Sequence, residues 1–123
     1  MNPKTHLIGR ILLAHIFILA GIGKIADPAG TMGYMQSAGL PGILVWPTIA
    51  LEVLGGLALV VGFQTRVAAY ALAIFTIVAA AIFHHDFANQ MQSLMFMKDM
   101  SITGGLLLLA ASGATALSMD AHR

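Results

Sequence analysis

The chain has 123 residues, of which 59% are hydrophobic and only 9% are charged. A soluble domain carries charges at about a quarter of its positions, so this composition predicts a protein of the lipid bilayer, built as a single domain over residues 1–123. The net charge of +1 does not indicate a nucleic acid partner, and the absence of cysteine excludes disulfides, thiolate metal sites and cysteine nucleophiles.

Apolar runs follow one another along the chain, each near the ~20 residues that a helix needs to cross a bilayer. They cover approximately residues 7–26, 43–62, 67–83 and 100–117. Backbone N–H and C=O groups in lipid must be paired within their own segment, so each run is expected to be a helix. The predicted fold is therefore all-α, an integral membrane bundle of four transmembrane helices.

Two of these runs have other interpretations. The first could be a cleaved signal peptide, but it lacks a convincing cleavage site and carries Lys24 where cleavage would fall, so an uncleaved helix is expected. The third is the shortest and is rich in alanine and β-branched residues, which would also suit a buried helix of a soluble bundle. Four such runs in so short a chain favour the membrane.

Basic residues near the helix ends predict the orientation. One side of the membrane would hold four of them and the other side two: Lys4, Arg10, Arg66 and Arg123 against Lys24 and Lys98. Cytoplasmic segments carry an excess of Lys and Arg. Both termini are therefore expected in the cytoplasm, with the first connection and the stretch 83–101 on the outside.

Glu52 lies near the middle of the second apolar run. A carboxylate at that depth costs several kcal/mol unless it is paired or protonated. Gly55 and Gly56 follow at i+3 and i+4 on the same helix face, where small residues allow close helix packing, so Glu52 is expected to face the bundle interior. Its role is left open between a structural acid that locks two helices and a functional acid in a ligand or proton path.

The first helix carries two cations on one stripe. Arg10 and Lys24 share a face with Phe17 and Gly21, and lie ~21 Å apart along the helix axis. Each is either a ligand-binding residue or an interfacial anchor that extends its charge toward water. His15 lies on another face of this helix and is expected to donate a hydrogen bond to a neighbouring helix.

The stretch 83–101, FHHDFANQMQSLMFMKDMS, is expected to form an outer loop and the start of the fourth helix. His84 would end a stripe on the third helix, and Lys98 would begin one on the fourth. With Lys24 and Asp27 from the first helix, these side chains predict a polar mouth above Glu52. The third-helix stripe comprises Tyr70, Ile74, Ile77, Ala81 and His84.

The segments RILLAHIFILAGIGKIADP, ALEVLGGLALVVGFQTRVAA, FHHDF and FMKDMSITGGLLLL resemble the DoxX family of small bacterial membrane proteins. The resemblance implies a four-helix inner-membrane protein, and relatives are described as membrane subunits of quinone-reducing sulfur oxidoreductases or as accessory proteins in redox-stress systems. The positions that match the family pattern are Arg10, Gly21, Lys24, Glu52, Gly55, Gly56, Arg66, His84 and Lys98.

The leading hypothesis is a redox-linked inner-membrane protein that binds a quinone or a similar small apolar molecule in an outward-facing pocket between helices. Glu52, His84 and Lys98 are the candidate catalytic residues, because such a ligand needs donors at its carbonyl oxygens and an acid nearby. Arg10 and Lys24 join them as candidate ligand-binding residues. The chain has no sequence sign of flavin, iron–sulfur or nicotinamide binding, so electrons would come from a redox partner protein or another cofactor.

Two other classes of function stay open, a copper-binding membrane protein and a non-catalytic scaffold. Methionine and histidine suit Cu(I), and several methionines are expected near the outer face beside His84 and His85: Met32, Met35, Met91, Met95, Met97 and Met100. Methionine is also a common apolar packer, so no metal site is assigned, and haem between His15 and His84 is less favoured still. The remaining alternative is a non-catalytic scaffold subunit in contact with membrane lipid, and an oligomer is compatible with any of these functions.

Overall fold

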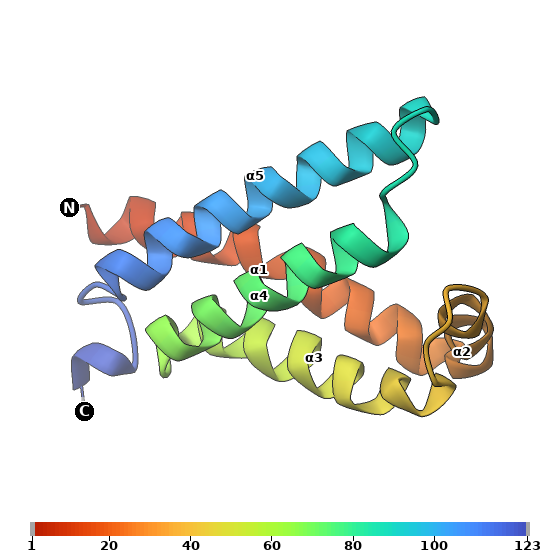
Figure 1. Cartoon of the computed structure of the whole chain (residues 1–123). Helices are drawn as coiled ribbons and strands as arrows, with labels where there is room; N and C mark the ends of the chain where they lie inside the picture. Colours follow the sequence, from red (N-terminus) through yellow and green to blue (C-terminus); the bar gives the residue numbers. More distant parts are fainter. Residues whose placement is uncertain (1, 123) are drawn as a thin grey trace.

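Four helices in residues 2–122, the part of the chain that the computed structural model describes, are long and apolar enough to cross a membrane. The all-α transmembrane fold is therefore confirmed (Figure 1). The elements are α1 (Pro3–Ala26), α2 (Pro28–Ser37), the 3-10 turn η1 (Gly42–Leu44), α3 (Val45–Val61), α4 (Thr65–Phe83), α5 (Gln90–Ser112) and the 3-10 turn η2 (Asp120–His122).

The last transmembrane helix begins and ends earlier than the run 100–117 predicts. Helix α5 begins at Gln90 because the Asn89 side chain accepts hydrogen bonds from the next backbone N–H groups, at 3.0 and 3.3 Å. It ends at Ser112 because Gly113 takes a φ of 71°. Most of the polar stretch before residue 101 is therefore helical, and the loop between α4 and α5 is shorter than expected.

The first connection also holds a helix that the sequence pattern did not predict. The Asp27 carboxylate accepts a hydrogen bond from Gly30 N–H at 3.1 Å, and Pro28 occupies the first helical position, so α2 has both an N-cap and a preorganised first turn. The Tyr34 ring stacks on Phe83 with centroids 4.9 Å apart. Helix α2 is thereby held against the end of α4.

The bundle is built from two helix pairs. Helix α1 packs along α3 and α4 packs along α5, while α3 and α4 join the pairs and α1 barely touches α5. A Cβ on Gly56 would lie 3.3 Å from the Ala14 carbonyl, and one on Gly55 would lie 3.2 Å from the Leu72 side chain. The two glycines thus serve different interfaces, α1–α3 and α3–α4. The Cβ position of Gly104 is open, with no atom of residues 2–122 outside its own helix backbone within 4 Å.

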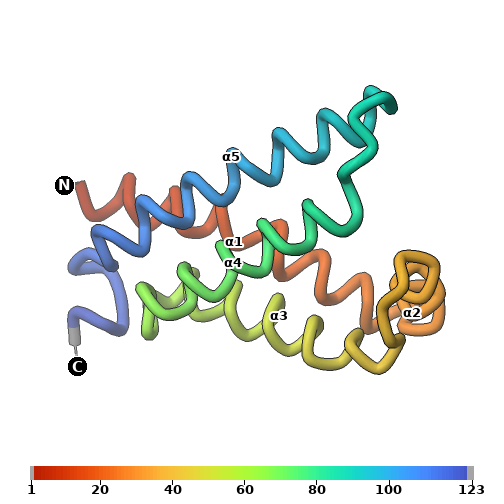
Figure 2. Tube along the Cα trace, in the orientation of Figure 1, coloured from red at the N-terminus to blue at the C-terminus, as the bar shows by residue number. Residues whose placement is uncertain are grey.

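Both ends of the described chain lie at the end of the bundle opposite α2 (Figure 2). There, two charged side chains cap neighbouring helices. Arg66 donates to the Ala111 and Ser112 carbonyls, at 3.0 and 3.3 Å, which satisfies the last turn of α5. The Asp120 carboxylate accepts from the Gln64 and Thr65 N–H groups, at 2.8 and 2.9 Å, and caps α4.

The orientation in the membrane stays a prediction. Lys4 and Arg66 lie at the end of the bundle that holds the termini, and Arg123 lies outside the described residues. Single cysteines at the exposed Ser37 and Ala116 should react with a membrane-impermeant thiol reagent from opposite sides, Ala116 from the cytoplasm. Labelling of both from one side of oriented vesicles would contradict this topology.

Candidate functional site

Glu52 forms an ion pair with Lys24 between α3 and α1. The Lys24 Nζ atom lies 2.7 Å from Glu52 Oε1, and the side chains are 23% and 5% exposed respectively. The pair sits where these helices approach closely, because a Cβ on Gly21 would lie 3.4 Å from the Glu52 Cβ. Glu52 points into the bundle, as its glycine-bearing face predicted.

A second pair joins the other two helices near the loop that connects them. His84 follows the last residue of α4, and its Nε2 lies 3.9 Å from Asp99 Oδ2 on α5, a contact that is an ion pair only when the imidazole is protonated. Among residues 2–122 no ion pair connects His84 or Asp99 to Lys24 or Glu52. The single polar mouth that the sequence predicted therefore appears as two separate pairs, one in each helix pair.

The stripe that led to His84 faces outward rather than into a pocket. Tyr70, Ile74 and Ile77 are 51%, 64% and 44% exposed, as expected for side chains that meet lipid. The opposite face of α4 is rich in small residues, which let α3 and α5 approach. Its buried residues are Thr65, Ala69, Leu72, Ala73, Thr76 and Ala80.

His15 does not pack between helices, contrary to the expectation. Its side chain is exposed, and its Nδ1 makes a hydrogen bond to the Leu12 carbonyl of its own helix. His15 also does not line the cavity of about 760 Å³ between α1 and α5.

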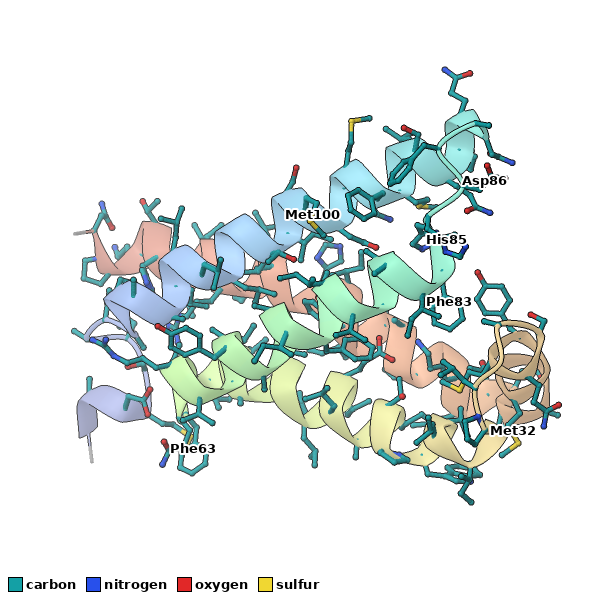
Figure 3. The ribbon with its side chains drawn as sticks, viewed as in Figure 1. Met32, Phe63, Phe83, His85, Asp86 and Met100 are labelled. Carbon is teal, nitrogen blue, oxygen red and sulfur yellow. The ribbon has the colours of Figure 1, made fainter. Side chains whose placement is uncertain are left out.

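The methionines proposed for copper lie on different parts of the fold. Met32 is in α2 and Met100 is in α5. In Figure 3 both residues lie away from His85, which is in the loop between α4 and α5. Residues 2–122 contain no group of three His, Asp or Glu side chains placed to hold one metal ion. Met32 and Met100 therefore do not join His85 in one ligand cluster.

A groove of about 760 Å³ lies between α1 and α5. It exists because these two helices barely touch, and because Gly9 and Gly105 contribute no side chains to fill it. We call it the α1–α5 groove. Its apolar walls are formed by Leu12, Leu13, Ile102, Leu108 and Leu109, and its polar lining residues are His6, Arg10, Lys98, Ser101 and Ser112.

Of the five sequence-predicted site residues, Arg10 and Lys98 line this groove, whereas Lys24, Glu52 and His84 do not. The Lys98 side chain is exposed, and no carboxylate of residues 2–122 lies within 4 Å of its ammonium group. The neighbouring Asp99 acts on Lys98 electrostatically but forms no ion pair with it, so the ammonium can donate hydrogen bonds to a ligand.

Arg10 is 1% exposed and is committed to backbone carbonyls. Its Nη1 donates to Leu59 O at 3.4 Å, and its Nη2 donates to Leu117 O. The Nε atom is buried and has no hydrogen-bond partner in the described chain. Of the two sequence interpretations of Arg10, the interfacial anchor is therefore wrong, because the guanidinium is enclosed by α3 and the C-terminal segment.

His6 is a lining residue that the sequence interpretation missed. It lies four residues before Arg10 on the same face of α1, and its Nδ1 is buried without a hydrogen-bond partner. The only sequence signal was this i, i+4 spacing to a charged residue. That spacing alone does not distinguish His6 from any other residue on this helix face, and only the groove shows that His6 lines a cavity.

A family model described as DoxX matches residues 5–85, about two thirds of the sequence. The chain belongs to the DoxX family. This DoxX family member is 49% identical over 114 residues to "Inner membrane protein YqjF" of Escherichia coli (strain K12), covering 93% of the chain and 88% of that relative. It is 37% identical over 126 residues to "Inner membrane protein YphA" of the same organism, covering 97% and 90%.

A more distant similarity joins part of this DoxX chain to "Putative oxidoreductase CatD" of Bacillus subtilis (strain 168). The two are 30% identical over 76 residues, 62% of the chain and 56% of that relative. No solved structure matched the chain. The two Escherichia coli relatives are named as inner membrane proteins, and the four apolar helices fit a multi-pass membrane protein.

Proposed function

We propose that this DoxX protein is a redox-linked membrane protein that binds a quinone in the α1–α5 groove. The observation that carries the proposal is the groove itself, with largely apolar walls, a volume of about 760 Å³ and an unpaired Lys98 ammonium. Small-molecule pockets of ~300–1,000 Å³ with a few convergent polar groups are typical ligand sites. Because α1 and α5 both cross the membrane, a lipid-soluble ring would enter from the bilayer.

The proposal divides the predicted residues into two groups. Lys98 and Arg10 line the groove, and Lys98 supplies N–H donors for a quinone carbonyl, which only accepts hydrogen bonds. Glu52 with Lys24, and His84 with Asp99, hold neighbouring helices together and thereby set the shape of the bundle. The proposed ligand site is therefore the α1–α5 groove, and not the outward-facing polar mouth that the sequence predicted above Glu52.

The redox part of the proposal is supported by the printed name of the Bacillus subtilis relative and by the DoxX family resemblance. A quinone takes up two electrons and two protons on reduction, so a partner must deliver or remove the electrons. The chain is therefore proposed to act as the membrane subunit, or as an accessory, of an oxidoreductase system whose partner protein carries the electron-transfer cofactor.

Replacing Lys98 with Ala should weaken binding of a short-chain ubiquinone by roughly 5- to 150-fold, the equivalent of losing about 1–3 kcal/mol of hydrogen bonding. Isothermal titration calorimetry on the protein in lipid nanodiscs would measure the dissociation constant of the quinone. Lys4→Ala is the matched control, because Lys4 is an exposed lysine that does not line the groove.

Met97→Leu tests the copper alternative in the same assay. The exposed Met97 precedes Lys98, and Leu retains its apolar volume but cannot ligate Cu(I). Quinone binding should survive this change. Unchanged affinity in Lys98→Ala, together with copper in the purified protein that disappears in Met97→Leu, would reject the quinone proposal.

A further inference from the structure

The polar residues that line the α1–α5 groove differ in how available they are to a ligand. Arg10 is 1% exposed and donates to two backbone carbonyls. The Ser101 and Ser112 hydroxyls also donate to backbone carbonyls, and the His6 ring contacts the backbone just after α5. Lys98 is exposed, and no carboxylate of residues 2–122 lies within 4 Å of its ammonium group. The freely available N–H donors of the groove are therefore those of Lys98.

The apolar part of the groove follows α5 from Lys98 toward the end of that helix. Fourteen residues of α-helix separate Lys98 from Ser112, a length of ~21 Å. The α5 residues that line the groove between these two positions are apolar apart from Ser101. Leu12 and Leu108 on the two walls are 62% and 75% exposed, so the groove is open to the bilayer along its side. The space is elongated, apolar and accessible from lipid.

Two glycines keep this apolar section open. Gly9 on α1 has no atom of residues 2–122 outside its own helix backbone within 4 Å of its Cβ position. A Cβ on Gly105, which lines the groove from α5, would lie 3.6 Å from the Leu13 side chain, an ordinary contact distance. Any larger side chain at Gly9 would extend into space that a ligand can otherwise occupy.

We propose that the α1–α5 groove is specific for quinones that carry a prenyl tail. The ring carbonyl accepts a hydrogen bond from Lys98 Nζ, and the tail lies beside Gly105 and Gly9, directed toward the end of the bundle that holds the termini (Figure 2). The inference rests on the proposed function, because it names the class of quinone and its direction in the same groove. A ligand with one polar end and a hydrocarbon chain matches a groove whose free donors lie at one end.

The tail is expected to add a moderate amount of affinity. A hydrocarbon chain that moves from lipid into the groove gains no hydrophobic free energy, because lipid is equally apolar. The gain comes from van der Waals contacts with the helices, which are small individually and add up along a chain. A ring without a tail would leave the section beside Gly9 and Gly105 uncovered.

Gly9→Leu tests the position of the tail, because the added side chain enters the groove. The Cβ has open space and Leu has a higher helix propensity than Gly, so the variant should retain the fold. Binding of a long-chain and of a short-chain ubiquinone would be measured in lipid nanodiscs, with each ligand expressed as its mole fraction in the lipid. The unaltered protein should bind the long-chain ligand ~5-fold or more tightly than the short-chain one. Gly9→Leu should remove this preference and leave the short-chain affinity within about twofold.

Gly23→Leu is the matched control on the same helix, since the Cβ position of Gly23 is equally open but Gly23 does not line the groove. It should leave both affinities and the tail preference unchanged. A tail preference that persists in Gly9→Leu would overturn the inference, and so would equal losses of both ligands, which would place the ring itself beside Gly9.

Equal affinity of the unaltered protein for the two ligands would also overturn the inference, and is the result expected if a phospholipid chain fills the apolar section. Each of these outcomes leaves the result for Lys98→Ala with short-chain ubiquinone intact. If the unaltered protein binds neither ligand, the proposed function fails and the tail site fails with it.

Discussion

Replacing Lys24 with Met is expected to lower the free energy of unfolding by about 2–4 kcal/mol, because it leaves a buried carboxylate without its partner. Glu52 is 5% exposed and its Oε1 lies 2.7 Å from Lys24 Nζ. No other cation of residues 2–122 lies within 4 Å of it. Denaturant unfolding in detergent micelles, followed by circular dichroism, would measure the loss.

The double variant Lys24→Met with Glu52→Gln should recover most of that stability, since a neutral amide no longer needs a countercharge. Lys4→Met is the surface control and should change the free energy of unfolding very little, because Lys4 is exposed and makes no ion pair in the described chain. If the losses of unfolding free energy from the two changes simply added in the double variant, a direct interaction between Lys24 and Glu52 would be contradicted. Quinone binding by this double variant would separate a structural role of Glu52 from the catalytic role predicted from sequence.

Arg10→Leu should destabilise the protein by about 3 kcal/mol, because hydrogen bonds from a charged donor contribute roughly 1.5–3 kcal/mol each and two are removed. These bonds tie α1 to the Leu59 carbonyl of α3 and to the Leu117 carbonyl of the C-terminal segment. Hydrogen exchange of the backbone amides in segment 113–122 should accelerate as well. The acceleration would show that the C-terminal segment has come away from the bundle.

Arg66→Leu is the comparison for Arg10→Leu, because Arg66 also donates to two carbonyls but does so on an exposed surface. Water can replace those bonds, so the loss should stay below about 1 kcal/mol. Equal destabilisation by the two changes would mean that burial of the Arg10 guanidinium adds nothing. Its placement in the core would then need another explanation.

The two pairs and the groove have different consequences for function. The Lys24–Glu52 and His84–Asp99 pairs each fall within one helix pair, α1–α3 and α4–α5, and the second contributes as an ion pair only when His84 is protonated. The α1–α5 groove lies between these units, where contacts are fewest. A ligand in the groove would add contacts between α1 and α5 that the bundle lacks, and would therefore stabilise the folded state.

The sequence by itself determined the number of transmembrane helices and the inward direction of Glu52. Apolar runs near the length of a bilayer must be helical because lipid offers no partner for a free backbone N–H or C=O. The helix starts at Pro28 and Gln90 were also encoded locally, by the capping side chains of Asp27 and Asn89. They were missed because polar composition was interpreted as a loop, although polar residues can cap a helix and form its first turns.

Only the tertiary structure decided which charged groups meet. Lys24, Arg10 and Lys98 look alike in sequence, yet one pairs with Glu52, one is enclosed by backbone carbonyls and one lines a groove without a carboxylate. These outcomes depend on how far each helix is rotated about its axis and on which neighbour it packs against. Rotation and pairing follow from contacts between distant residues, such as Gly56 against Ala14, which no local pattern specifies.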